Sequence, residues 1–421
     1  MAADTLTATP LEDVDFGSAA FLADPFPILA RLREEAPVFW SNTQHAWIVT
    51  RHADVLQAFR DTRLSASRIV PFLEQIPGGL GHDFPLIRRF ESAWITNVDM
   101  PVHARLRRLM MNAFSKSVVE GLRPNVTTTS RGLLARIDGS DVEFVGDVAR
   151  VLPSSVVAQM FGIPPELRDR FAVWAGRIQQ ATGAAVLTRE MVVDYHQTLE
   201  DMNIELQKLI ELRRRDPKDD LLSEFVRARD AGDRLSDDEL LGACHATIIG
   251  GFETTMHMLT LGLIELTTRP WLQAYLLAGR DQAQKTVDEL LRYIGMAKGM
   301  LRIAREDFTW HDQPIRKGAL VFAMNASANR DPRAWDRPDE IDPERNNSRS
   351  AAFGPGMHFC LGQLLARMEL EEFFTAVFRD YDVEIPSDER PYINSFTFRG
   401  LERLPVRMTR RPTCPYPGDR S

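Results

Sequence analysis

The chain has 421 residues, of which 44% are hydrophobic and 26% are charged, so it can bury a large core and lacks the bias of a disordered chain. Its formal net charge of −8 disfavours nucleic acid as a partner, because a phosphate backbone attracts a basic surface. Three cysteines are too few for a disulfide framework and are typical of a reducing compartment, which predicts a cytoplasmic protein.

The N-terminal residues 1–21 are acidic and mixed, without the basic start and apolar run of a signal peptide. The sequence contains no stretch of about 18 apolar residues, so we expect neither a membrane span nor a membrane partner. The charged segment 213–220 is typical of a linker, but the motifs described below lie on both sides of it and need one another. We therefore predict a single domain over 1–421, with tails at 1–20 and 409–421.

Helical patterns dominate and predict a mainly α fold with minor β. In chain order, the expected helices are 25–35, 103–114, 191–215, 236–268, 282–293 and 361–378, with short strands at 46–50, 301–304, 320–324 and 396–398. The longest helix opens with a capping box of Ser236 and Glu239 and closes before Pro270. At 1.5 Å per residue it would span roughly 50 Å and cross the whole molecule.

The segment 353–362, Phe-Gly-Pro-Gly-Met-His-Phe-Cys-Leu-Gly, carries the strongest chemical signal. Its glycines and proline predict a tight turn that lets the backbone approach a ligand closely. Cys360 stands where a helix is expected to begin, and the amides there favour a thiolate, which binds iron in haem proteins. A buried, unreactive cysteine is the alternative, and the complete pattern disfavours it. Zinc is also disfavoured, because the chain has no paired Cys-x-x-Cys and no His-Glu-x-x-His helix.

Segment 250–255, Gly-Gly-Phe-Glu-Thr-Thr, lies midway along the longest helix and weakens its interior. The hydroxyl of Thr254 can bond the carbonyl of Gly250, which would bend the helix and leave a groove where O2 can sit. Two other helices carry paired side chains: Glu289 with Arg292, and His103 with Arg107, which can bind a carboxylate. The alternatives are a solvated Glu-Thr cluster, a chance ion pair and a basic surface helix.

These segments together resemble the cytochrome P450 family, whose Phe-Gly-x-Gly-x-His-x-Cys-x-Gly loop is matched completely at 353–362. The resemblance extends from near Pro25 to near Arg407, with the motifs in the family's order. It implies the cytochrome P450 fold, a triangular helical prism with haem b (iron protoporphyrin IX) between the long central helix and the cysteine-loop helix.

The resemblance also implies a role for each motif. Cys360 is the iron ligand, and the other cofactor contacts are His103, Arg107, Arg302, His358, Phe353, Gly354, Gly250 and Gly251. Glu253 and Thr254 are the catalytic acid–alcohol pair that delivers protons during O2 activation. Glu289, Arg292 and Arg345 form a structural brace for the cysteine loop. Gly250 stands where the family more often has Ala, which predicts a slightly wider groove.

By the same resemblance, the substrate is expected to contact segments 65–97, 172–187, 295–301 and 396–398 and the long helix. The named pocket residues are Ala243, Thr247, Met296, Met300, Phe396 and Phe398. Gly78, Gly79 and Gly81 suit a mobile lid. Met296 replaces a proline common in the family, and with Met300 it forms either an adaptable wall or ordinary core. Lys298 is interpreted as a solvated lysine, with a carboxylate anchor as the alternative.

The function implied is a monooxygenase that inserts one oxygen atom from O2 into an apolar small molecule. The chain has no flavin or iron–sulfur segment, so electrons are expected from NAD(P)H through a separate ferredoxin or flavodoxin and its reductase. Arg105 and Arg108 are the predicted basic patch for that donor. Oxidative coupling or ring formation in secondary metabolism, peroxide-driven oxidation and a non-catalytic haem sensor are the alternatives. The intact Glu253–Thr254 pair disfavours the last two.

Overall fold

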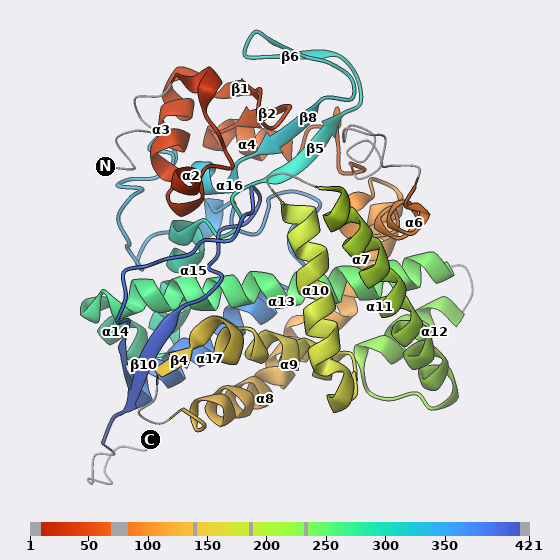
Figure 1. Ribbon diagram of the computed structural model, residues 1–421, viewed down its shortest axis with the longest axis vertical. Helices are drawn as coiled ribbons and strands as arrows, with labels where there is room; N and C mark the ends of the chain where they lie inside the picture. The colour runs from red at the N-terminus through yellow and green to blue at the C-terminus, as the bar shows by residue number, and fades with distance from the viewer. Residues whose placement is uncertain (1–9, 69–82, 138–140, 185–187, 231–234, 413–421) are drawn as a thin grey trace.

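Helices make up most of the residues that the computed structural model describes, which are 10–68, 83–137, 141–184, 188–230 and 235–412 (Figure 1). The helices are α2 (Ala19–Ala23), α3 (Phe26–Glu35), α4 (His52–Ala58), α6 (Pro85–Glu91), α7 (Val102–Met111), α8 (Lys116–Leu134), α9 (Val151–Met160), α10 (Arg168–Gly183), α11 (Arg189–Arg215), α12 (Leu221–Asp230), α13 (Asp237–Thr267), α14 (Pro270–Leu277), α15 (Arg280–Ile294), α16 (Asn325–Ala328) and α17 (Gln363–Asp380). Short 3-10 or π turns are η1 (Leu11–Asp13), η2 (Ile95–Asn97), η3 (Asn112–Phe114), η4 (Val145–Ala149), η5 (Pro165–Leu167) and η6 (Asn347–Arg349). The predicted mainly α fold with minor β is confirmed.

A five-stranded sheet lies at one end of the molecule, beside α2, α3 and α4 (Figure 1). Its strands, in order, are β1 (Val38–Ser41), β2 (Ala46–Val49), β8 (Leu320–Ala323), β5 (Met300–Ala304) and β3 (Leu64–Ser65). Strands β2 and β8 are parallel, and the other neighbours are antiparallel. A second sheet has the order β4 (Asp141–Glu143), β10 (Pro405–Arg410) and β9 (Tyr381–Glu384), and β6 (Phe308–Trp310) pairs with β7 (Gln313–Ile315).

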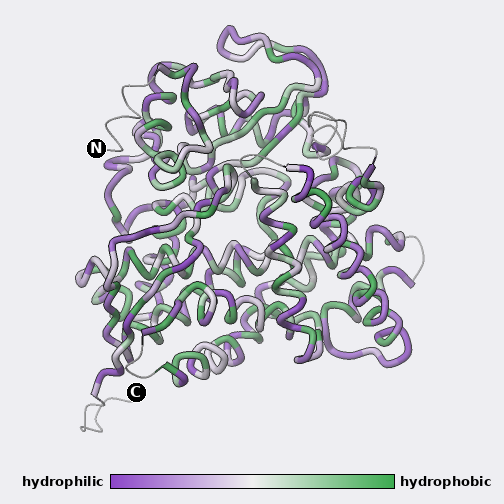
Figure 2. The backbone as a smooth tube through the Cα atoms, in the orientation of Figure 1, coloured by the Kyte–Doolittle hydropathy of each residue, from purple (hydrophilic) through white to green (hydrophobic). Residues whose placement is uncertain are grey.

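Helix α13 runs across the molecule, and α9, α10 and α17 pack against it (Figure 1). Its predicted capping box is confirmed: the Glu239 N–H donates to Ser236 Oγ at 3.1 Å, and the Ser236 N–H donates to Glu239 Oε2 at 2.9 Å. Figure 2 shows hydrophobic positions gathered along the interior helices, whereas the β6–β7 hairpin is largely hydrophilic. Of the helices described, α13 included, none is long and apolar enough to span a membrane.

The strand predicted at 396–398 does not form. Phe398 makes an isolated bridge with Ala297, and its N–H donates to Ser395 Oγ at 3.1 Å. The Phe396 N–H donates instead to the Gly183 carbonyl at 3.0 Å. Because neighbouring backbone groups bond to different elements, no continuous ladder develops. The other predicted strands and all predicted helices are present, with ends shifted by a few residues.

The described part of the predicted N-terminal tail packs into the core. Val14 and Phe16 are buried, and the Phe16 ring meets those of Phe21 and Phe396 at centroid distances of 5.0 and 5.7 Å. At the other end, β10 extends to Arg410, so the predicted tail at 409–421 begins inside a strand. Residues 1–9 and 413–421 lie outside the described ranges.

Candidate active site

A cavity of about 330 Å³ lies between α13 and the loop that leads into α17. Apolar side chains form most of its wall. Of the residues predicted for the site, it is lined by Cys360, His103, Arg107, Arg302, His358, Phe353, Gly354, Gly250, Gly251, Thr254, Thr247, Met296, Met300 and Phe398. Residues that lie far apart in the sequence therefore meet at one place.

The cysteine loop is shaped by its two glycines. Gly354 and Gly356 have φ angles of +68° and +90°, in the region that favours glycine. A Cβ at Gly356 would also lie 2.9 Å from the carbonyl oxygen of Phe59, so the loop approaches that backbone closely. The Cys360 N–H donates to the Phe353 carbonyl at 3.0 Å, which closes the turn.

The environment of the Cys360 thiol differs from the predicted one. Helix α17 begins only at Gln363, and burial raises the pKa of Cys360, although the Gly362 N–H and the charge of Arg367 oppose this. The protein alone therefore favours the thiol. A thiolate at this position needs a bound cation, as a metal ion supplies.

Four side chains with cationic or N–H donor groups converge on the cavity. His103 and His358 lie with ring centroids 4.1 Å apart, and Nε2 of each has no hydrogen-bond partner among the described residues. Burial lowers the pKa of Arg302 to about 9, and its guanidinium donates to the carbonyl of the adjacent Leu301 at 2.8 Å. Arg107 Nη1 donates to the Phe359 carbonyl at 2.8 Å.

No carboxylate of the described chain pairs with these four groups. Asp99 exerts a charge effect on His103, His358 and Arg302, but its own oxygens accept from Ser65, from the Ala66 N–H and from Arg305. His103 and Arg302 are buried and Arg107 and His358 are half-buried, and donors shielded from water in this way require acceptors. The two propionates of haem supply them, so the residues present fit that group.

Thr254 has the predicted bond: its hydroxyl donates to the Gly250 carbonyl at 2.8 Å. Gly250 opens onto the cavity, with no atom within 4 Å of an added Cβ. Gly251 packs instead against Val157 of α9, whose Cγ2 would lie 2.7 Å from a Cβ there. The cavity face of α13 therefore has an open groove beside the Thr254 hydroxyl.

Glu253 does not line the cavity. Its carboxylate points towards α10, where Oε1 would lie 2.6 Å from a Cβ at Gly176, and Oε2 is 3.7 Å from Nε2 of His257. Burial raises the pKa of Glu253, and the charge of Arg150 partly opposes this. The acid and the alcohol are thus neighbours in sequence on different faces of the helix.

Two predicted pocket residues lie elsewhere. Ala243 is buried where α13 packs against its neighbours, and its carbonyl accepts a hydrogen bond from the Thr247 hydroxyl at 2.8 Å. Ala246, three residues further along the helix, lines the cavity instead. Phe396 packs into the N-terminal core, with its ring centroid 4.6 Å from that of Phe322. Both predictions are wrong because the helix phase and the turn at 395–398 direct these side chains away from the cavity.

The interpretation of Lys298 as a solvated side chain is also wrong. Lys298 is fully buried and donates from Nζ to the Ser395 carbonyl at 2.6 Å, and burial lowers its pKa to about 7. Gly78, Gly79, Gly81 and residues 185–187 lie outside the described ranges. Phe59 and Asn329, which line the cavity, were not predicted, because neither belongs to a local motif.

Arg105 is not part of a free basic patch. It forms an ion pair with Glu239 of the α13 capping box, with Nη1 3.1 Å from Oε2. Arg108 is exposed at the surface, one residue beyond the Arg107 that contacts the cysteine loop. Of the two arginines predicted to form a basic docking patch, only Arg108 therefore remains a candidate.

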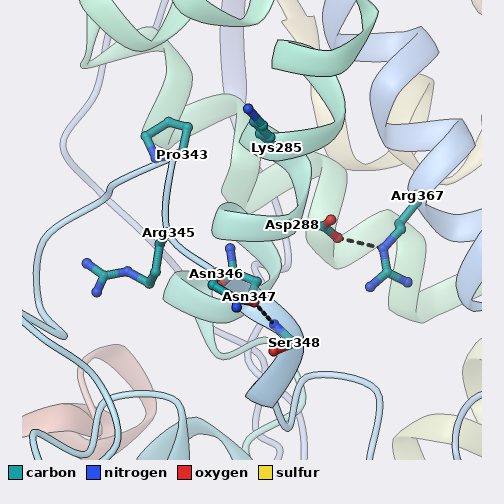
Figure 3. Close-up of a pocket in the computed structure, with 8 residues that line it drawn as sticks. All are labelled: Lys285, Asp288, Pro343, Arg345, Asn346, Asn347, Ser348 and Arg367. Carbon is teal, nitrogen blue, oxygen red and sulfur yellow. Dashed lines mark hydrogen bonds and ion pairs between the residues drawn. The ribbon is translucent and has the colours of Figure 1, made fainter.

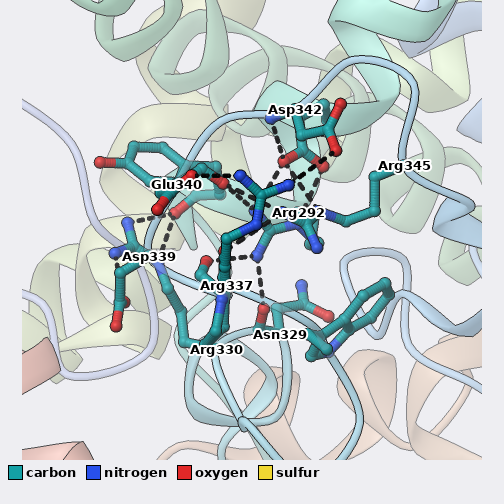
Figure 4. A network of polar contacts seen from close by, with 12 residues as sticks. Arg292, Asn329, Arg330, Arg337, Asp339, Glu340, Asp342 and Arg345 are labelled. Atoms are coloured by element: carbon teal, nitrogen blue, oxygen red, sulfur yellow. Dashed lines mark hydrogen bonds and ion pairs between the residues drawn. The ribbon is translucent and has the colours of Figure 1, made fainter.

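The predicted brace residues meet in a buried cluster, in which Figure 4 labels Arg292 and Arg345. Arg292 donates to both oxygens of Glu289, at 2.7 and 2.9 Å, and both side chains are 0% exposed. Arg345 Nε reaches Glu289 Oε1 at 3.2 Å, and the Asp342 N–H reaches the same oxygen at 2.9 Å. Arg292 also donates to the carbonyl of Asn329 at 2.8 Å, so the cluster joins α15 to the segment before the cysteine loop.

Figure 3 shows a second pocket, of about 320 Å³, between α15, α17 and the loop at 343–348. Asp288 and Arg367 pair there with Oδ1 and Nε 2.6 Å apart, and Lys285 Nζ lies 3.0 Å from Glu344. These charges are met within the chain, so this pocket is not the predicted site.

Comparison with known proteins points to one family. The family model "Cytochrome P450" matches residues 82–283 and 277–407. The polyketide biosynthesis cytochrome P450 PksS of Bacillus subtilis (strain 168) is 32% identical over 403 residues, covering 93% of this chain and 97% of that protein. The vitamin D(3) 25-hydroxylase of Pseudonocardia autotrophica is 32% identical over 412 residues, covering 96% and 98%. The solved structure of epothilone B-bound cytochrome P450epoK has a TM-score of 0.85 at 27% identity, covering 94% of this chain and 100% of that one.

Glu289→Ala should lower the free energy of unfolding by about 3–5 kcal/mol, because it leaves the buried guanidinium of Arg292 unpaired. Asp288→Ala is the matched control, since its ion pair with Arg367 has side chains that are 36% and 32% exposed. That loss should cost no more than about 1 kcal/mol. Chemical denaturation of both variants measures the difference, and equal destabilisation would contradict the brace.

Proposed function

Because the chain belongs to the cytochrome P450 family of O2-dependent oxidoreductases, we propose that it inserts one oxygen atom from O2 into an apolar small molecule. The observation that carries this proposal is the shared cavity, which Cys360 and the Thr254 groove both line. Haem supplies the redox-active iron when it is bound. The relatives named for polyketide biosynthesis and for vitamin D(3) hydroxylation support an apolar substrate, and the first supports a role in secondary metabolism.

The proposal gives one task to each of the predicted cofactor-binding and proton-transfer side chains. The Cys360 sulfur would hold the iron. His103 and Arg107 would bind one propionate, and Arg302 and His358 would bind the other, because these donors line the cavity and lack acid partners in the described chain. Thr254 holds and passes protons at its hydroxyl, and Glu253 supplies them.

The part of the cavity wall proposed to contact the substrate is mainly apolar. Met296, Met300 and Phe398 line it, and the Thr247 hydroxyl is occupied by the Ala243 carbonyl at 2.8 Å. Few polar groups are left to orient a ligand, so shape and the flexible methionine side chains select it. A bulky apolar compound suits this wall, and the relative from Pseudonocardia autotrophica is a hydroxylase of such a compound, vitamin D(3).

Electrons reach the site from a separate ferredoxin or flavodoxin, supplied by a reductase with NAD(P)H. The proposed docking surface, called here the donor face, consists of Arg108, Met111, Met357 and Phe359. Three of these are exposed apolar side chains, at 51%, 41% and 37% for Met111, Met357 and Phe359. The Arg107–Phe359 bond places α7 beside the cysteine loop, and Met111 follows Arg107 by one helical turn. Apolar contact with a cation at its edge suits a small acidic electron carrier.

Cys360→Ala should remove the strongly red-shifted band that thiolate-ligated haem gives with carbon monoxide after reduction, together with most of the bound haem. Cys244→Ala is the matched control, because Cys244 is buried in α13 and does not line the cavity. Absorption spectra of the two reduced variants decide the question. An unchanged band in Cys360→Ala would overturn the proposed function.

Thr254→Ala should keep substrate binding but divert reducing equivalents into peroxide, so that product per electron falls sharply. The reason is that Thr254 is the hydroxyl held at the groove beside Gly250. Thr254→Ser should restore most of the yield, because it keeps the hydroxyl. Thr260→Ala is the control for packing, since Thr260 makes the same bond to the Met256 carbonyl at 2.9 Å outside the cavity. Unchanged product yield in Thr254→Ala would exclude Thr254 from proton transfer.

Arg108→Glu should slow reduction by an acidic ferredoxin and flatten its dependence on salt, while substrate affinity stays the same. Opposite charges speed encounter, and salt screens them with a Debye length of about 8 Å at physiological ionic strength. Arg410→Glu changes the net charge equally on β10, which lies on the other side of the molecule from α7 (Figure 1). Stopped-flow measurement of the reduction rate at low and high salt compares the two variants. Equal rates in both would show that the electron donor docks on another face.

A further inference from the structure

Behind Glu253 lies a second buried ionisable side chain, His257, which the proposed function does not use. His257 follows Glu253 by four residues on α13, and the two side chains therefore share one face of the helix. Its Nε2 is 3.7 Å from Glu253 Oε2, and only 2% of its side chain is exposed. Neither ring nitrogen has a hydrogen-bond partner among the described residues.

The surrounding backbone makes room for this pair at two glycines. A Cβ at Gly400 would lie 2.1 Å from His257 Nδ1, and a Cβ at Gly176 would lie 2.6 Å from Glu253 Oε1. The imidazole and the carboxylate therefore occupy space that any other residue at these positions would fill. This fit holds both side chains at the edge of the site with their polar atoms facing.

The charges around the pair are few. Arg150, an exposed residue at the start of α9, acts on both side chains, while α10 and the loop before β10 meet them at Gly176 and Gly400. Burial lowers the pKa of His257 to about 4, so the imidazole is neutral near pH 7. A neutral imidazole carries one N–H donor and one acceptor nitrogen, so it can give a proton on one side and take one on the other.

We infer that His257 exchanges protons with the Glu253 carboxyl and so connects the Glu253–Thr254 pair to solvent near Arg150. In this transfer the acceptor nitrogen of the ring takes a proton from the solvent pool as the N–H on the other nitrogen gives one to the carboxylate, so the imidazole ends neutral and no electrons move. The 3.7 Å gap is longer than a hydrogen bond, and a rotation of the carboxyl or one bridging water closes it. His257 acts through Glu253, as a positioning residue, and the inference rests on the proposed function.

His257→Leu is the test variant, and His245→Leu is its matched control. His245 lies on the same helix, is fully buried, and has both ring nitrogens unpartnered among the described residues. It contacts the rings of Phe90 and Trp94, at centroid distances of 5.7 and 6.2 Å, and has no nearby carboxylate among them. The two variants therefore remove the same buried imidazole with and without its acid.

The first measurement needs no turnover. The infrared band of the protonated Glu253 carboxyl, assigned by its loss in Glu253→Gln, is followed against pH in the resting protein. Loss of an N–H donor disfavours the carboxylate, so the midpoint should move to higher pH in His257→Leu and stay in place in His245→Leu. The second measurement is product per electron and the solvent deuterium isotope effect. In His257→Leu the yield should fall several-fold and the isotope effect should rise, while substrate affinity and the carbon monoxide band stay unchanged.

Gly400→Ala provides an independent variant, since it crowds the imidazole without altering the chemistry of Glu253. It should lower the product yield in the same direction as His257→Leu. The inference is overturned if His257→Leu leaves either the carboxyl midpoint or the product yield unchanged, or if His245→Leu reproduces both changes. Failure of the proposed function is distinguishable, because the unaltered protein itself would then lack the carbon monoxide band or form no product.

Discussion

Glu289 is a fully buried carboxylate, and the position of the cysteine loop depends on how its charge is met. Arg292 and Arg345 both donate to it, and the Asp342 N–H adds a third partner. Removing one partner from such a cluster leaves a buried charge, which costs several kcal/mol. Because the partners come from α15 and from the segment before the cysteine loop, the cluster is satisfied only when these two parts of the chain are in their native arrangement.

Asn329 connects this buried cluster to the cysteine loop through hydrogen bonds. Its carbonyl accepts from Arg292 at 2.8 Å, and its side-chain Oδ1 accepts from the Ala351 N–H at 2.7 Å. The Ala351 carbonyl accepts from Gly354, and the Phe353 carbonyl accepts from Cys360, each at 3.0 Å. A continuous run of hydrogen bonds therefore leads from the buried ion pair to the residue that faces the cavity. Residues that perform no chemistry thus set where the sulfur lies.

The sequence predicts best those features that short segments encode by themselves. The turn at 353–362, the capping box at Ser236 and the Thr254–Gly250 bond each involve residues only a few positions apart. Errors arise where a distant partner decides the outcome. Arg105 lies in a basic segment that predicts a solvent-exposed arginine, yet it forms an ion pair with Glu239. Phe396 packs into a hydrophobic core with residues from the N-terminal part of the chain. No local pattern contains these partners, so sequence periodicity alone could not have found them.

The division of labour along α13 follows from helix geometry. Consecutive residues point about 100° apart, so Glu253 cannot share the face of Thr254. With Thr254 held at the groove, the acid must turn towards α10 and His257. This separation keeps a carboxylate out of an apolar cavity, where an apolar substrate would strip water from its charge at a large cost in free energy. The same arrangement places the acid next to His257, the imidazole inferred to exchange protons with it. A helix that carried both groups on one face would have to give up either the apolar cavity or the proposed proton supply.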